Sequence, residues 1–132
     1  MTSFGNRFDE LSNHWAKFKE LSITVSLDGP PEVSNYIRHF SDNSVIEKNV
    51  KKVQKWATEN SISLNLLGSC AYSAYNIAYF PETAKYITEL GLRYIANQVE
   101  SPFFISAQVL PREEKRRITD RFKDFRHNIE SE

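Results

Sequence analysis

A strict alternation of aliphatic and hydroxylated residues limits the folds open to this chain more than any other feature. It runs over residues 21–27, with Leu21, Ile23, Val25 and Leu27 at the odd positions and Ser22, Thr24 and Ser26 at the even ones. Successive side chains of a strand point to opposite faces, so the run predicts a strand with one apolar and one polar face. Gly29-Pro30-Pro31 ends this strand, because proline lacks the amide hydrogen that a ladder needs and restrains its predecessor.

The rest of the chain predicts helices and strands in alternation. Apolar residues at helical spacing predict helices over about 6–20, 44–60, 81–90 and 111–129, and strand-like runs cover 62–67, 92–99 and 104–109. Ser44 and Glu47 form a capping box that predicts Ser44 as an N-cap, and Gly91 is typical of a helix stop. Strand–helix–strand units of this length indicate one α/β domain over residues 1–132, with parallel strands and right-handed crossovers. The last strand follows its predecessor too closely for a parallel crossover, so it is either antiparallel or part of one bent strand.

Each predicted strand combines an aliphatic face with a polar or small one. The second faces are formed by Ser22, Thr24 and Ser26; Ser63, Asn65 and Leu67; Ala96, Gln98 and Glu100; and Ser106 and Gln108. Helices on the outer face and polar groups on the inner face fit an open or partial (β/α) barrel, in which ligands bind at the carboxyl ends of the strands. The polar residues near that rim would be Ser26, Asp28, Asn65, Gln98 and Glu100. The other interpretation is that they face bulk water on a one-layer sheet.

Composition and motifs exclude several classes of site. The sequence has 17 basic and 17 acidic residues, so no overall charge favours nucleic acid or a membrane, and the apolar runs are too short to span a bilayer. We therefore expect a cytoplasmic protein. A single cysteine, Cys70, excludes an internal disulfide and a cysteine-based metal site, and we expect it to be a buried structural residue. No phosphate-binding glycine motif or metal-ligand spacing occurs, so no catalytic or metal-binding residue is predicted.

Three segments, in order along the chain, resemble the radical S-adenosylmethionine (radical SAM) enzymes, most closely the group often called twitch-type. They are ITVSLDGPPEVSNYIR at residues 23–38, YNIAYFPETAKYITELGL at 75–92 and ESPFFISAQVLP at 100–111. The resemblance covers about residues 21–111 and implies the second half of a partial (β/α) barrel, with parallel strands and helices on the outer face. In that family a CxxxCxxC segment holds a 4Fe–4S iron–sulfur cluster, which cleaves S-adenosylmethionine to a radical. This chain has no such segment.

The resemblance implies roles for seven residues in binding S-adenosylmethionine. Ser26 would donate a hydrogen bond to the cofactor, Asp28 would organise the turn after its strand, and Arg38 would pair with a carboxylate of cofactor or substrate. Arg38 as an ordinary surface residue is an equal alternative. Asn65 and Ser69 are candidates for the ribose side, and Gln98 and Glu100 for the lumen.

These features lead to one expectation and two alternatives. We expect a fragment of a radical SAM core that contributes part of the S-adenosylmethionine pocket and is inactive alone, with any 4Fe–4S cluster supplied by a missing N-terminal half. The chain could instead be one half of a split enzyme, completed by a separate N-terminal polypeptide. The third interpretation is a stand-alone α/β binding module that uses a sheet edge or the basic last helix for a protein or RNA partner, with nucleic acid disfavoured by the neutral charge.

Overall fold

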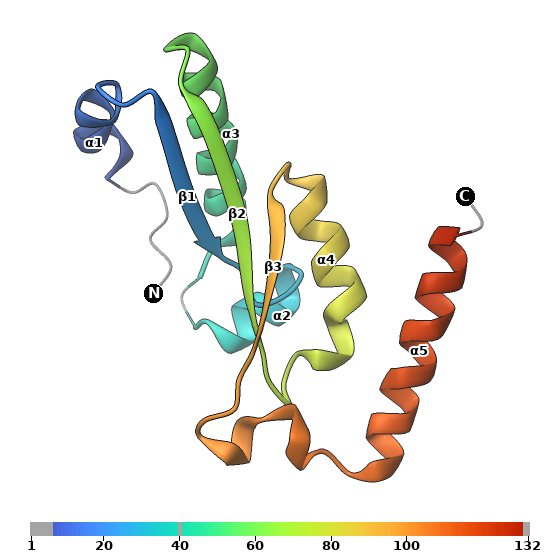
Figure 1. Ribbon diagram of the computed structural model, residues 1–132. Coiled ribbons are helices and arrows are strands. Elements are labelled where there is room, and N and C mark those ends of the chain that lie inside the picture. Colours follow the sequence, from blue (N-terminus) through green and yellow to red (C-terminus); the bar gives the residue numbers. More distant parts are fainter. Residues whose placement is uncertain (1–6, 40, 131–132) are drawn as a thin grey trace.

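The computed structural model describes residues 7–39 and 41–130. A three-stranded parallel sheet forms the centre of the protein, and its strands are β1 (Glu20–Ser26), β2 (Ser63–Tyr72) and β3 (Arg93–Gln98), which lie side by side in that order. The helices are α1 (Phe8–Trp15), α2 (Pro31–Ile37), α3 (Asn43–Glu59), α4 (Phe80–Glu89) and α5 (Arg112–Glu130), with short 3₁₀ turns η1 (Ile77–Tyr79), η2 (Phe103–Ile105) and η3 (Ala107–Val109). This arrangement confirms the predicted α/β class and its parallel strands (Figure 1).

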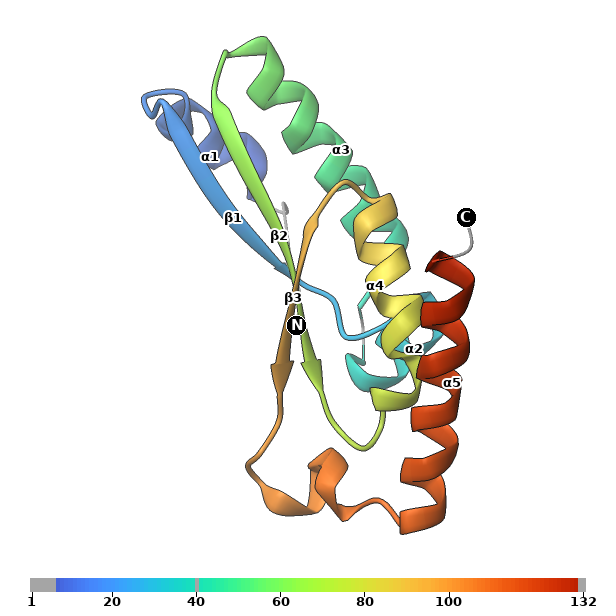
Figure 2. The same ribbon diagram turned by 45° about the vertical axis from the view of Figure 1, so that its right-hand side comes forward.

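Helices cover one face of the sheet and form the core there. Figure 2 shows α3, α4 and α5 together on one side of the sheet. The buried apolar side chains come from the covered face of the strands and from the stripes of α3 and α4: Val25, Leu66, Cys70, Ile46, Val50, Val53 and Ile87. Removing these groups from water stabilises the fold by about 25 cal/mol per Å² of apolar surface.

Gly68 sets how closely α4 approaches the sheet. It lies in the middle of β2, and a Cβ at this position would collide with Cγ2 of Ile87, a fully buried residue of α4. The absence of a side chain at one strand position therefore allows the helix to pack directly on the backbone of the central strand.

Several boundary predictions are wrong. Residues 104–109 do not form a strand but lie in the two 3₁₀ turns η2, which follows Pro102, and η3, which the Ser106 hydroxyl caps by accepting from the amide of Gln108. Asp42, and not Ser44, caps α3, since its carboxylate accepts hydrogen bonds from the amides of Ser44 and Val45. The sequence pattern predicted no helix between Gly29 and Ser44, where the structure has α2, which begins with Pro31 at a position where the missing amide hydrogen costs nothing.

Candidate functional site

A hollow of about 410 Å³ lies at the carboxyl ends of the three strands. Residues that follow each strand line it: Asp28, Tyr36 and Ile37 after β1, Ala71, Ser73 and Tyr75 at the end of β2, and Val99 and Ile105 after β3. Its walls are mainly apolar, and the rings of Tyr36 and Tyr75 are exposed at its rim. This is the edge at which open parallel sheets bind ligands, and the volume is in the range of small-molecule sites.

Asp28 is the charged group in the wall of this hollow. It is 5% exposed, and its carboxylate accepts one hydrogen bond from Nε of Arg38 at 2.5 Å and another from the amide of Ala71 at 3.1 Å. A buried carboxylate is tolerated only with such partners. The pair thus ties the end of β1 to β2 and fixes where the Arg38 guanidinium lies.

Asn76 is a buried polar residue that bonds to three of the residues lining the hollow, Asp28, Ala71 and Ser73. It is fully buried, and its Nδ2 donates to the carbonyl oxygens of Asp28 at 2.8 Å and Ala71 at 3.0 Å. Its Oδ1 accepts from the backbone amide of Ser73 at 2.8 Å and from the Ser73 hydroxyl at 3.2 Å. One amide side chain therefore joins the loops that follow β1 and β2.

The sequence positions the loop after β1 through Gly29 and the two prolines. A Cβ on Gly29 would lie 2.7 Å from Val33 of α2, so the turn between β1 and α2 leaves room only for glycine. Arg38 is the residue at which the same short helix ends, and its side chain forms the ion pair with Asp28, which precedes the helix. The Gly-Pro-Pro segment thus both ends the strand and begins the helix that places Arg38 within reach of Asp28.

The polar face of the sheet is confirmed for β1 and β2. Ser26 is paired with Ser69 in the register of the two strands, so their side chains share the face opposite the helices. On the same face, Nδ2 of Asn65 donates to the hydroxyl of Ser22 at 3.2 Å. Ser26 and Ser69 lie near the carboxyl ends of β1 and β2, whereas Asn65 lies near the amino end of β2, on the exposed surface of the sheet.

The predicted face of β3 is wrong by one residue. Gln98 is paired with Tyr72, so it lies on the opposite face from Ser26 and Ser69. Asn97 occupies the polar face instead, and its Nδ2 donates to the hydroxyl of Ser69 at 3.0 Å. Glu100 lies beyond the end of β3 and is exposed, next to Val99 in the wall of the hollow.

Sequence reasoning missed Asn76, Ser73 and the two rim tyrosines, Tyr36 and Tyr75. An asparagine shortly after a predicted strand, in SAYN, is a signal for a turn that bonds its own backbone. Nothing in that signal shows the contact to Asp28, which lies 48 residues earlier.

Cys70 is a buried structural residue, as expected. It is fully buried on the covered face, and burial raises the pKa of its thiol from 9.0 to about 12, so it remains protonated. Over residues 7–39 and 41–130, no group of three metal-binding side chains comes together.

Among the described helices, none has the length and apolar character needed to cross a bilayer.

Comparison with protein-family models, with curated proteins and with solved structures found no match to this chain.

Proposed function

We propose that the hollow at the carboxyl ends of the strands is part of an S-adenosylmethionine pocket in a partial (β/α) barrel of the radical SAM type. The observation that carries the proposal is the ion pair between Arg38 and the buried Asp28 carboxylate, which lies in the wall of a small-molecule-sized hollow at the ligand-binding edge of a parallel sheet. The order of the three sequence segments that resemble this family supports the same assignment.

The chemistry of the side chains fits the polar parts of S-adenosylmethionine. A guanidinium is suited to pair with the carboxylate of an amino-acid moiety. The hydroxyls of Ser26 and Ser69, near the ends of β1 and β2, can bond hydroxyl groups of a ribose. The open polar face of the sheet then corresponds to the inner face of the barrel.

The 4Fe–4S cluster of that family does not fit this chain. Cluster iron needs several thiolates, whereas the sequence has one cysteine, and Cys70 is fully buried with a protonated thiol. We therefore expect the chain to be inactive by itself. Cluster absorbance and reductive cleavage of S-adenosylmethionine by the reconstituted chain alone would disprove this.

Calorimetric titration with S-adenosylmethionine tests the pocket. Ser26→Ala should weaken binding about fivefold, the value of one ordinary hydrogen bond. Ser22→Ala removes the same hydroxyl from the same face of β1, four residues from the rim, and should leave the affinity unchanged. Equal affinities for the two variants, or the absence of binding, would refute the assignment.

A split enzyme is the second candidate. Among the described residues, β1 and β3 each pair on one side only, so both edges of the sheet offer backbone groups to further strands. A polypeptide that carries CxxxCxxC and the missing strands would complete both the barrel and the cluster site. Co-expression of this chain with such a partner, followed by purification through a tag on one chain, would recover both proteins.

A further inference from the structure

The edge strand β3 has backbone groups that point away from β2. The amide of Val99 donates to the carbonyl of Tyr72 at 2.7 Å, and alternate residues before Val99 face β2 in the same way. Tyr94, Ala96 and Gln98 therefore direct their amides and carbonyls to the outer edge. Ala96 and Gln98 are exposed, and within the described part of the chain no further strand pairs with this edge. Such an edge can accept another strand.

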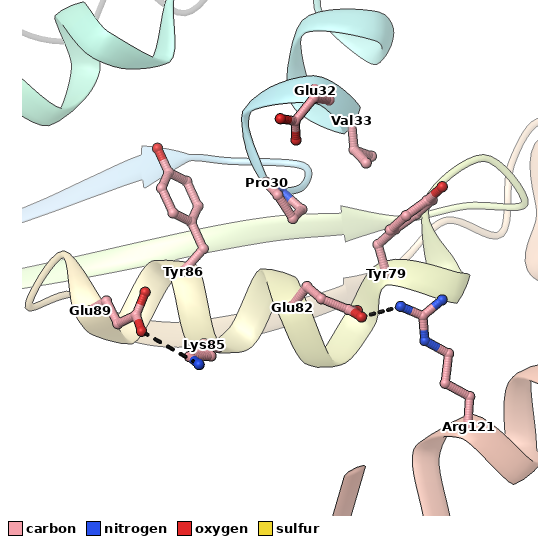
Figure 3. A pocket seen from close by; sticks show the side chains of 9 residues that line it. All are labelled: Pro30, Glu32, Val33, Tyr79, Glu82, Lys85, Tyr86, Glu89 and Arg121. Atoms are coloured by element: carbon pink, nitrogen blue, oxygen red, sulfur yellow. Dashed lines mark hydrogen bonds and ion pairs between the residues drawn. The ribbon is translucent and has the colours of Figure 1, made fainter. Parts of the chain in front are cut away.

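Opposite charges lie at the two ends of this edge. Arg93 is the first residue of β3, and Glu100 follows shortly after the strand has ended. Both residues are exposed, and among residues 7–39 and 41–130 neither side chain has an ion-pair partner. On α4, by contrast, Figure 3 shows Glu82 already paired with Arg121 of α5. The charges at the ends of β3 are therefore open to a partner of matching charge.

A second copy of the chain supplies both charges in the required order. In an antiparallel pair of β3 strands, the amino end of one meets the carboxyl end of the other, so each Arg93 comes close to Glu100 of the second copy. The outward-facing residues are centred on Ala96, which then lies opposite itself at a two-fold axis, with Tyr94 opposite Gln98. We propose that β3 pairs with β3 of a second copy in this register and forms one continuous sheet across a dimer.

This register uses every outward backbone group of β3. Each opposed outward pair exchanges two hydrogen bonds, which gives about six across the contact. Ala96 lies on the helix side of the sheet and is small, so the two copies can approach closely at the axis. A contact between two short strands is small, and interfaces that bury less than about 1,200 Å² belong to weak complexes. We expect a reversible dimer that depends on protein concentration.

The other edge of the sheet, on β1, lacks this complementarity. Lys19 and Glu20 lie together at its amino end. Beyond its carboxyl end, Asp28 is buried and already paired with Arg38. Two antiparallel β1 strands would therefore bring no pair of opposite charges together. The pairing through β3 leaves the β1 edge open, and it does not depend on which ligand the carboxyl-end hollow binds.

Sedimentation equilibrium of the full chain, at protein concentrations up to about 1 mM, tests the proposal. We expect a monomer–dimer equilibrium. Arg93→Glu alone, or Glu100→Arg alone, should weaken the dimer about tenfold at low salt, because each ion pair becomes a contact between like charges. The double variant exchanges the two charges and should restore the natural affinity. A monomer at every concentration, or a double variant no tighter than the single ones, would overturn the proposal.

Proline substitution identifies which edge is used. Ala96→Pro removes an outward amide and leaves the ladder with β2 intact. The amide of Leu27 donates to Ser69, so Thr24 faces outward on β1, and Thr24→Pro is the matched control. Ala96→Pro should abolish the dimer and Thr24→Pro should leave it unchanged, with unchanged circular dichroism in both. A dimer that survives Ala96→Pro, or that Thr24→Pro also abolishes, would refute the contact. If a proline variant unfolds, the charge exchange decides.

Discussion

At the scale of single residues, Asn76 holds together the segments that surround the carboxyl-end site. It satisfies four backbone or side-chain groups at once and is fully buried. Removing it leaves the carbonyls of Asp28 and Ala71 and the amide of Ser73 without these partners. Buried polar groups that lose a partner carry their full desolvation cost.

We expect Asn76→Ala to lower the free energy of unfolding by about 2–4 kcal/mol, as for the breaking of a buried hydrogen-bond network. Urea unfolding followed by circular dichroism measures this. Asn97→Ala, which removes one exposed hydrogen bond to Ser69, is the matched control and should cost less than about 1 kcal/mol. Similar losses for both variants would show that Asn76 does not have this role.

Asn97, and not the predicted Gln98, lies on the polar face of β3, and the reason for this error shows why the site residues were only partly predictable. The polar faces of β1 and β2 follow directly from alternation and agree with the register. In β3, Ile95 lies on the open face, whereas Ala96 and Gln98 lie on the helix side and are exposed. Because β3 is an edge strand that α4 covers only in part, residue polarity there does not report which face a side chain occupies.

At the scale of elements, the start of α3 depends on a charged cap. The hydroxyl of Ser44 and then the amide of Val45 donate to the Asp42 carboxylate and lower its pKa below 3.8. A group whose pKa is lower in the folded state stabilises the fold above its unfolded pKa, and this stabilisation is lost as the pH falls through the folded value.

We therefore expect Asp42→Ser, whose cap does not titrate, to lose less stability than the natural chain between pH 6 and pH 3. Urea midpoints at the two pH values give the comparison, and all other carboxylates titrate equally in both proteins. An equal loss in both would mean that the Asp42 carboxylate does not cap the helix.

The contact between β2 and α4 gives a second prediction at this scale. Gly68→Ala places a methyl group against Ile87 and should cost about 1–3 kcal/mol through overpacking. Ile87→Ala removes the obstructing Cγ2, which valine would keep, so the double variant should be more stable than the sum of the single losses predicts, by at least about 0.5 kcal/mol. Thermal or urea unfolding of the four proteins measures this coupling, and strict additivity would contradict the contact.

Most elements were predictable, and the exceptions have physical causes. Long helices with clear periodicity, such as α3 and α4, were placed to within a few residues by their apolar stripes. The strand expected over 104–109 was not found, because apolar residues in a short run do not distinguish a strand from 3₁₀ turns. The cap of α3 was misassigned, since both Asp42 and Ser44 are good capping residues and only the backbone geometry separates them.

At the scale of the whole molecule, stability is unevenly distributed. The central strand β2 pairs on both sides and contributes Leu66 and Cys70 to the core. No side chain of α5 that the structure describes is buried, and its Phe122 ring packs on Phe80 with a centroid distance of 5.4 Å. The helix thus adds little buried apolar surface to the fold.

We expect native-state hydrogen exchange to separate these two elements. Amides of β2 should exchange only through global unfolding, whereas those between Arg112 and Arg126 should exchange at least about a hundredfold faster through local opening of α5. Mass spectrometry of peptic fragments resolves the two segments. Protection of α5 equal to that of β2 would show that the helix opens only with the whole domain.

The position of Asn76 also has a consequence for the order in which the molecule assembles. Its contact to Asp28 joins residues 48 positions apart and requires that β1 already lies beside β2 and that the Ser73–Asn76 turn has closed. We therefore expect this contact to form late in folding, so that its loss acts mainly on the rate of unfolding and little on the rate of folding. The hydrogen bonds of Asn76 thus keep the ends of β1 and β2 from separating once the two strands have paired.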